Sequence, residues 1–253
     1  MLRKTLQAVA FATLAVAGAS ALAQDNEPKV GYVYALYYEC DGSLALVDEL
    51  IDKYHAPLLD AAVKDGTIAG WGWLAHHTGG TWERVAYIVG TSLDGAMDGI
   101  NKVGERIGKE IPVANREFFG NCRRHEDYVW RTAAGRDATP GTERGTAGLS
   151  VYWKCDTTRE SRADELVSKV YGPVLDAQVA SGLLTSWGWL EHVLGGEYRR
   201  LWTLTGPDFK SVLKARDTMI SEMQSQQAEA MQEFGAISGT HVDYLWDIQK
   251  STP

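Results

Sequence analysis

Along the first half of this chain, segments in which apolar and polar residues alternate are interspersed with segments in which apolar residues recur every three or four positions. This order is typical of an antiparallel sheet covered by helices. Alternating aromatic and β-branched residues predict strands, and apolar residues every three or four positions predict helices. The predicted elements are a strand at 32–40, a helix at 43–64, strands at 68–77 and 82–89, a helix at 92–107 and a strand at 125–131. Pro57 should kink the first helix, Gly66 should end it, and Gly79-Gly80 should form a hairpin turn. The segment 118–122 is expected to be irregular.

The second half of the chain repeats this pattern 116 residues later. Residues 66–80 read G-T-I-A-G-W-G-W-L-A-H-H-T-G-G, and residues 182–196 read G-L-L-T-S-W-G-W-L-E-H-V-L-G-G. Strands are expected at 149–155, 184–193, 198–205 and 241–246, and helices at 161–180 and 207–234. The segment 132–147 contains almost no large apolar side chain and predicts a linker. The chain therefore divides into a first unit, 24–131, and a second unit, 148–253, each of ordinary domain size.

Each half has the order β-α-β-β-α-β, which is the ferredoxin-like arrangement. One such sheet is covered by helices on a single face, so two units in one chain can bury their bare faces against each other. On this element order and the repeated strand–hairpin segments, each half resembles the dimeric α/β-barrel superfamily. The predicted fold class is therefore α+β, with two ferredoxin-like βαββαβ units fused in tandem. They would form an intramolecular dimeric α/β barrel, a pseudo-dimer within one chain.

The resemblance implies several functions, because the superfamily includes cofactor-free oxygenases, haem enzymes and small-molecule binders. His55-Ala56-Pro57-Leu58 is similar to a helix motif found in some members. The second unit has Tyr171-Gly172-Pro173-Val174 at the matching place, so the motif is not repeated. Membership of the superfamily therefore leaves the function open.

The N-terminal segment predicts export. M-L-R-K precedes an apolar, Ala-rich run that closes with Ala21-Leu22-Ala23, the pattern of a signal peptide cleaved before Gln24. An uncleaved anchor is the alternative, but a bilayer span needs about 20 strongly apolar residues, and this run is rich in Ala and Gly. Residues 1–23 are therefore expected to be removed. The product should be a soluble exported protein, periplasmic or secreted, without stable membrane insertion.

Charge and motif content exclude several classes of function. The formal net charge is −8, and cleavage removes Arg3 and Lys4 but no acid, which makes it −10. Because such a surface repels phosphate backbones, no nucleic-acid partner is expected. The sequence has no C-x-x-C, Cys/His cluster, phosphate-binding loop, nucleophile elbow or H-E-x-x-H motif. No metal site and no conventional hydrolase or nucleotide chemistry is therefore predicted.

Three cysteines in an oxidising compartment predict one disulfide and one free thiol. In the ferredoxin-like order the fourth strand lies beside the first, so Cys40 should meet Cys122, three residues before the fourth strand. Cys155 matches Cys40 in the second unit, where Ile237 or Ser238 falls at the place of Cys122, so Cys155 should be free. A Cys40–Cys155 bridge between the units is the alternative.

The motif W-G-W-L-x-H-x-x-G-G is the strongest local signal. By strand alternation its two tryptophans share one face, while the glycine, leucine and histidine share the other. The rings would either fill a core beside the sheet or form the wall of an apolar pocket for a planar ligand. The candidate ligand-binding tryptophans are Trp71, Trp73, Trp187 and Trp189.

His76 and His192 are the candidate catalytic residues, because they occupy matched strand positions. Such a His can exchange a proton, ligate a haem or metal, or make a structural hydrogen bond. Arg84 and Arg200 are also matched and could bind a ligand carboxylate or pair with a helix acid. The last strands repeat H-x-D-Y-x-W, in which the Asp could orient the His or tie the strand to its neighbour.

Three functions follow from these patterns. The first is an exported protein that binds a small apolar or aromatic molecule in a Trp- and His-lined pocket and transforms it without a cofactor, or only binds it. The second is a haem or metal protein that uses His76 or His192. The third is a non-catalytic structural or interaction module. The first is preferred, with no cofactor expected and haem as the runner-up.

Overall fold

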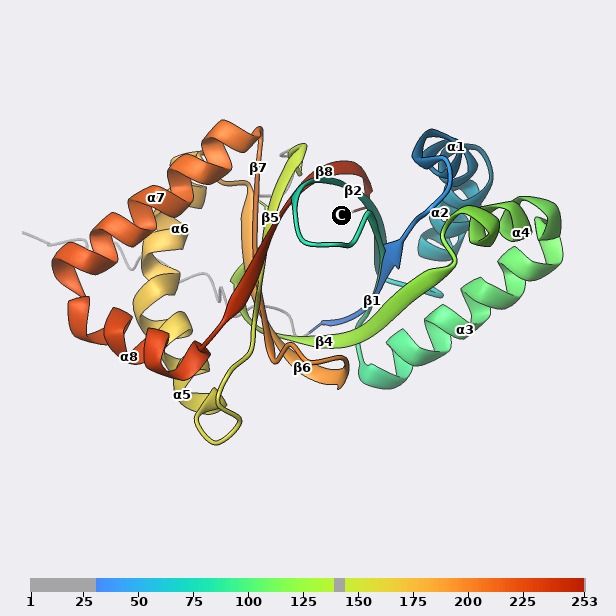
Figure 1. Cartoon of the computed structure of the whole chain (residues 1–253). Helices are drawn as coiled ribbons and strands as arrows, with labels where there is room; N and C mark the ends of the chain where they lie inside the picture. The colour runs from blue at the N-terminus through green and yellow to red at the C-terminus, as the bar shows by residue number, and fades with distance from the viewer. Residues whose placement is uncertain (1–30, 139–143, 253) are drawn as a thin grey trace, which may run out of the picture.

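The computed structural model describes residues 31–138 and 144–252, and within them eight antiparallel strands close into one barrel (Figure 1). The predicted signal peptide lies outside the described residues. The order around the barrel is β1-β3-β2-β8-β5-β7-β6-β4, so each unit contributes four strands. The units join edge to edge through the antiparallel pairs β2–β8 and β4–β6. The strands are β1 (Tyr32–Glu39), β2 (Gly70–Gly79), β3 (Arg84–Gly90), β4 (Arg124–Arg136), β5 (Ala147–Trp153), β6 (Ser186–Gly195), β7 (Arg200–Gly206) and β8 (His241–Ser251).

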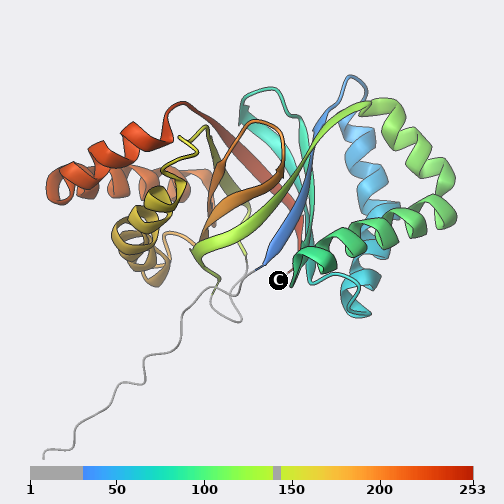
Figure 2. The same ribbon diagram turned by 90° about the horizontal axis from the view of Figure 1, so that it is seen from below.

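Helices cover the barrel on two opposite sides, one layer from each unit (Figures 1 and 2). The tandem ferredoxin-like prediction is therefore confirmed, with the bare faces of the two sheets forming the barrel interior. The first layer contains α1 (Leu44–Leu50), α2 (Ala56–Lys64), α3 (Leu93–Glu110) and α4 (Pro112–Asn121). The second contains α5 (Glu160–Leu166), α6 (Gly172–Ala180), α7 (Phe209–Gln226) and α8 (Ala228–Ser238).

The first helix of each unit contains one π-helical turn, which in the first unit lies just before Pro57, where a kink was predicted. This turn spans Ile51–His55 in the first unit and Val167–Tyr171 in the second. Pro57 lacks an N–H, and the Ala56 N–H before it bonds to Ile51 O, one residue farther back than in an α-helix. The interruption predicted at Pro57 is confirmed as this widened turn.

The helices differ from the prediction in two places, and one strand is longer than predicted. Residues 112–121 form a helix, although 118–122 was expected to be irregular: a break at Ile111 is followed by Pro112 in the first turn, where its missing N–H costs no bond. The second unit has the same break at Gln227, so the single helix expected over 207–234 is two helices. In addition, β4 continues to Arg136, five residues into the predicted linker, because it pairs with β6.

The apolar residues form three clusters. One lies under each helical layer, on the outer face of the barrel. The third fills the barrel interior and is rich in aromatic rings. Its buried members are Ala35, Tyr37, Trp82, Val85, Tyr128, Trp130, Tyr152, Leu190, Leu201, Tyr244 and Trp246.

The disulfide links Cys40 and Cys122, as predicted, with Cα atoms 3.9 Å apart. It joins the end of β1 to the segment before β4, which lie side by side in the sheet. Cys155 is a buried free thiol, also as predicted, and Ser238 occupies the place of the missing partner.

Candidate functional site

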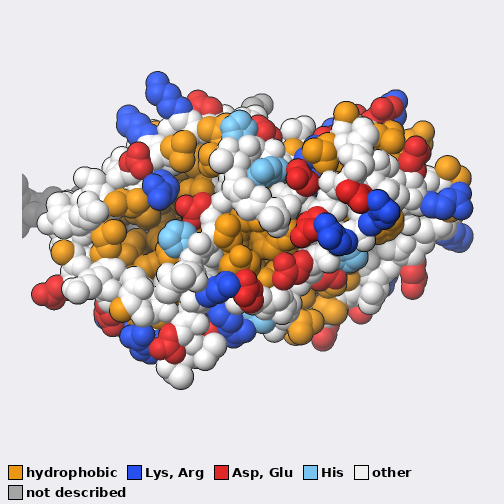
Figure 3. Space-filling model, viewed as in Figure 1, with side chains coloured by type: hydrophobic (Ala, Val, Ile, Leu, Met, Phe, Trp, Pro, Cys, Tyr) orange, Lys and Arg blue, Asp and Glu red, His pale blue; other side chains and the backbone are white. Residues whose placement is uncertain are grey.

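The barrel has a hollow at the end where β1 and β5 finish. Four antiparallel pairings separate β1 from β5, so the two strands run in the same direction and finish at the same end. This hollow, called the mouth hollow below, has a volume of about 430 Å³. Figure 3 shows hydrophobic side chains near the middle of this face of the molecule, bordered by acidic and basic ones. The lining residues are Tyr37, Glu39, Trp82, Arg123, Arg124, His125 and Glu126.

Aromatic rings form the floor of the mouth hollow. The Trp82 ring lies between Tyr37, with centroids 4.2 Å apart, and Tyr244, stacked at 5.1 Å. Tyr152 meets Trp82 edge-on at 5.1 Å. Burial raises the pKa of the Tyr37 and Tyr152 phenols well above their usual value, so both are neutral at physiological pH. The floor is therefore a rigid, uncharged aromatic surface.

The hairpin that carries Trp82 is held by the other unit. The Tyr244 hydroxyl, on β8, accepts a hydrogen bond from the Thr81 N–H at 2.9 Å. A Cβ atom on Gly80 would lie only 2.1 Å from that hydroxyl oxygen, so this close approach requires glycine. Tyr128 packs in the same way against Gly196 in the second unit. The tyrosine of each H-x-D-Y-x-W motif thus packs on the Gly-Gly pair of the other unit.

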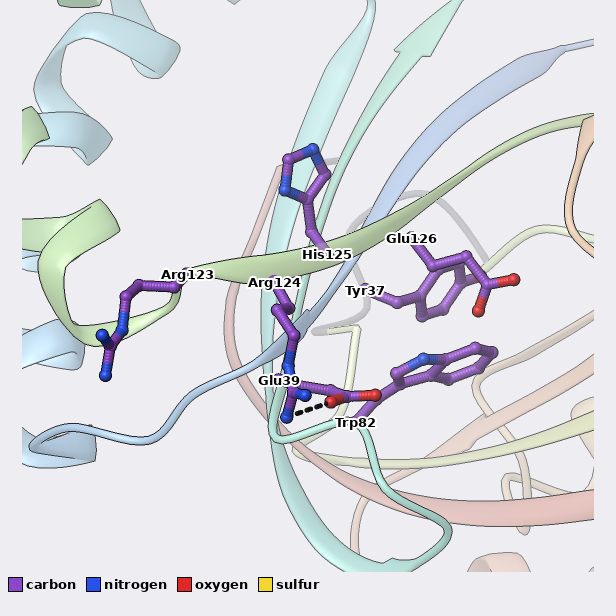
Figure 4. Close-up of a pocket in the computed structure, with 7 residues that line it drawn as sticks. All are labelled: Tyr37, Glu39, Trp82, Arg123, Arg124, His125 and Glu126. Carbon is purple, nitrogen blue, oxygen red and sulfur yellow. Dashed lines mark ion pairs between the residues drawn. The ribbon is translucent and has the colours of Figure 1, made fainter.

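Charged side chains form the rim of the mouth hollow. Arg124 pairs with Glu39 at 2.7 Å, and Glu126 accepts a hydrogen bond from the Tyr128 hydroxyl at 3.2 Å. Figure 4 shows Tyr37, Trp82 and Glu126 close together, while Arg123 and His125 point away from them. Arg123 pairs instead with Asp41, at 2.5 Å. The inner rim therefore consists of one ion pair and one further carboxylate.

The predicted ligand-binding tryptophans and arginines lie elsewhere, on the outer face of the sheet. In the first unit, Asp48 on α1 accepts hydrogen bonds from Trp73 Nε1 at 2.8 Å and from two nitrogens of Arg84. Trp71 Nε1 donates to Asp60 on α2 at 2.8 Å. The second unit repeats all of these contacts, with Trp189 and Arg200 bonded to Asp164 and Trp187 bonded to Asp176.

These contacts tie the first helix of each unit to its sheet. Trp73 and Trp189 are 1% and 0% exposed, and the Arg84 and Arg200 side chains are almost fully buried. A buried guanidinium paired bidentately with a carboxylate has its donors satisfied within the protein. A ligand-binding role for these residues stays a prediction, and their contacts favour a structural one.

His76 and His192 face the barrel interior, at the two junctions between the units. Each imidazole stands edge-on to a stacked Tyr–Trp pair from the other unit, with centroids 6.0–6.1 Å apart. Each Nε2 atom is buried without a hydrogen-bond partner. This geometry, present in both units, is that of an N–H directed at aromatic rings.

The protonation state of His192 follows from its neighbour Arg199. Arg199 Nη1 lies 2.7 Å from His192 Nδ1. Because a guanidinium only donates, Nδ1 accepts and the proton resides on Nε2. Burial and the charge of Arg199 lower the pKa of His192. His192 is therefore neutral near pH 7, and its catalytic role, like that of His76, stays a prediction.

A second hollow lies outside the barrel, between α1 and the end of β8. Its volume is about 420 Å³. Lys250 crosses it to pair with Asp52 at 2.5 Å, so its charged groups are matched within the protein. Of the residues predicted for ligand binding, Trp73 alone lines it. The lining residues are Asp48, Glu49, Ile51, Asp52, Trp73, Gln249 and Lys250.

His76 and His192, the predicted haem ligands, do not fit a haem. An axial imidazole must direct a nitrogen at the iron, with space for the macrocycle beside it. The Nε2 atoms of His76 and His192 are buried against aromatic rings, and that of His55 is buried beside Phe118. None of the three lines either hollow. Among the described residues, no group of three or more His, Cys, Asp or Glu side chains could hold a metal ion.

No specific sequence signal marks the mouth residues. Trp82 precedes β3 and turns into the barrel, whereas Arg84, two residues later, points outward. Simple alternation would place Trp82 on the outer face together with Arg84, which is wrong. Glu126 does alternate with Tyr128 and Trp130, which face the interior. That alternation, within H-x-D-Y-x-W, could have indicated that Glu126 points inward.

Comparisons with known proteins support the fold. No protein-family model and no curated protein matches this sequence. Among solved structures, an anthrone oxidase-like protein matches with a TM-score of 0.57 at 14% identity, covering 90% of this chain and 94% of its own. A protein of Lactobacillus acidophilus assigned provisionally as a monooxygenase matches with a TM-score of 0.57 at 7% identity, covering 88% and 96%. A protein assigned provisionally as a chlorite dismutase matches with a TM-score of 0.50 at 7% identity, also covering 88% and 96%.

At these identities the likeness concerns the fold. Each match extends over nearly the whole of both chains, so both units and their arrangement are shared. The architecture of this chain agrees with that likeness: the eight-stranded barrel is closed, and each unit supplies four strands and one helical layer. The chain therefore has the fold of a tandem dimeric α/β barrel.

Proposed function

We propose that this protein binds a small aromatic or apolar molecule in the mouth hollow. The observation that carries this proposal is a hollow of about 430 Å³ with an aromatic floor and a few polar groups at its rim. Ligand sites are commonly concave, largely apolar and furnished with a few polar groups that fix orientation. The floor residues Tyr37 and Trp82 contact Tyr152 and Tyr244 of the other unit, which supports a preformed site.

Calorimetry with 2-naphthylmethanol, a neutral aromatic probe, tests the proposal. Trp82→Leu removes the floor and should weaken binding at least about tenfold, since a well-packed aromatic contact contributes about 1.4 kcal/mol or more. Trp202→Leu is the matched control, because Trp202 is as buried as Trp82, at 5% exposed, but lies in the cluster under the second helical layer, away from the mouth hollow. Circular dichroism would confirm that both variants fold. Absence of binding to the wild type, or equal losses in both variants, would refute the site.

We also propose that the protein is exported after removal of residues 1–23. The Cys40–Cys122 disulfide supports this location, because disulfides persist in oxidising compartments. No described helix is long and apolar enough to cross a bilayer. Mass spectrometry of the protein recovered from an exporting bacterial host should show an N-terminus at Gln24. A mass corresponding to the full chain would contradict cleavage.

A further inference from the structure

The two halves of the barrel mouth differ in charge. Strand register matches Glu39 with Lys154, because Tyr38 pairs with Arg84 and His125 just as Trp153 pairs with Arg200 and His241. The same register matches Arg124 with Thr240 and Glu126 with Val242. Trp82 and Tyr198 both precede the third strand of their units. The first unit therefore carries two acids and an arginine where the second carries one lysine.

In the second unit, the protein supplies its own ammonium group at the mouth. Lys154 Nζ lies 5.8 Å from the centroid of the Tyr198 ring and 2.6 Å from Glu197 Oε1. An aromatic ring and a carboxylate together form a favourable environment for an organic cation. That half of the mouth is thus already occupied by a cation of the chain itself.

In the first unit, the matching place holds no ammonium. Glu39 replaces the lysine and is paired with Arg124. Glu126 accepts one hydrogen bond, from Tyr128, and among the described residues it forms no ion pair. Burial raises the pKa values of Tyr37, Tyr128 and Tyr198, and the nearby carboxylate of Glu126 raises them further. A half-buried carboxylate that lies beside aromatic rings and has no cationic partner is stabilised when a cation binds to it.

We propose that the molecule bound in the mouth hollow carries an ammonium group and that Glu126 is the carboxylate that pairs with it. This inference rests on the proposed function and adds the chemical class of the ligand. Arg124 is neutralised by Glu39, and Arg123 points away and is paired with Asp41. His125 also points away and lies 3.5 Å from Asp127, so the lining of the hollow offers no free cation for an anionic ligand. The ligand class is therefore an aromatic or apolar amine.

Three probes with the same ring system test the charge preference by calorimetry at pH 7.4: 2-naphthylmethylamine, 2-naphthylmethanol and 2-naphthoate. The amine should bind at least about tenfold more tightly than the alcohol, because a charge-assisted hydrogen bond replaces a neutral one. The carboxylate should bind most weakly. The advantage of the amine should shrink as salt is raised, since the rim is open to solvent.

Two variants assign the preference to its residues. Glu126→Gln keeps an acceptor for Tyr128 and should bring the amine and the alcohol to within about twofold of each other. Glu39→Lys copies the second unit and should weaken amine binding at least about tenfold through repulsion, while alcohol binding changes little. Equal affinity of the amine and alcohol for the wild type, or an undiminished preference in Glu126→Gln, would overturn the inference but not the site. Failure of all three probes to bind would overturn both.

Discussion

Protonation of one buried histidine, His55, should contribute to acid destabilisation of this protein. His55 lies in the π-helical turn between α1 and α2. Its side chain is 5% exposed, and its Nε2 atom has no hydrogen-bond partner. Burial lowers the pKa of His55 from 6.5 to about 4, because the charged imidazolium would lose its hydration. The unfolded chain therefore binds this proton at a higher pH than the folded chain does.

The sign and size of the change in the free energy of unfolding follow from proton linkage. Because the pKa of His55 is lower in the folded state, stability is full above about pH 6.5 and falls as the pH drops toward about 4. Below about pH 4 the imidazole is protonated in both states and the loss stops growing. The full shift corresponds to about 3 kcal/mol, of which about 2 kcal/mol is lost between pH 7.5 and pH 5.

A variant that copies the second unit isolates this effect. Tyr171 occupies the position equivalent to His55 and does not become cationic, so His55→Tyr should remove the part of the acid sensitivity that His55 contributes. Urea denaturation of both proteins, with the disulfide intact, would be measured between pH 7.5 and pH 4.5. Other titrating groups contribute to both curves and cancel in the difference between the two proteins. Parallel pH dependences for wild type and variant would refute the reasoning.

Three further predictions concern stability and are measured by urea denaturation. Trp73→Ala should cost about 3–5 kcal/mol, because the ring is fully buried and bonded to a helix; a loss under about 1 kcal/mol would show that it is not core. Ser238→Cys should form a second disulfide with Cys155 and stabilise by about 2–4 kcal/mol, and non-reducing peptide mapping that finds two free thiols would contradict it. Gly80→Ala should cost about 1–3 kcal/mol by displacing the tyrosine packed on it, whereas Gly104→Ala, with open space around it, should cost nothing. Equal effects of the two alanines would contradict the close-contact argument.

The barrel could be predicted from the sequence because its determinants are local and repeated. The period of apolar residues predicted each strand, and the matched halves predicted a pseudo-dimer whose sheets share an interior. Alternation also placed Trp73 and His76 on opposite faces, as observed. The break at Gln227 was missed because the predicted helix 207–234 was read through it. The helix α4 was missed because it buries only Ala114 and Phe118 and so gives a weak apolar period.

The mouth hollow could not be predicted, because it is formed by residues that no single pattern unites. Tyr37 comes from the end of β1, Trp82 from a hairpin, and Glu126 from the start of β4. These segments meet only when the barrel closes and when Tyr244 from the other unit fixes the hairpin. The tryptophans and arginines that stood out in the sequence did so because a repeated helix-to-sheet contact requires them.

Fusion of the two units explains how one barrel mouth can hold an asymmetric site. In a symmetric dimer, any side chain at the mouth is present twice, so a group that favours a ligand on one half is repeated on the other. In a single chain the halves can differ, and here Lys154 replaces Glu39 and Val242 replaces Glu126 while the barrel framework is unchanged. These charge differences lie at the mouth, whereas the contacts that tie helix to sheet are the same in both units. This distribution is expected when one half binds a ligand and the other serves as its scaffold.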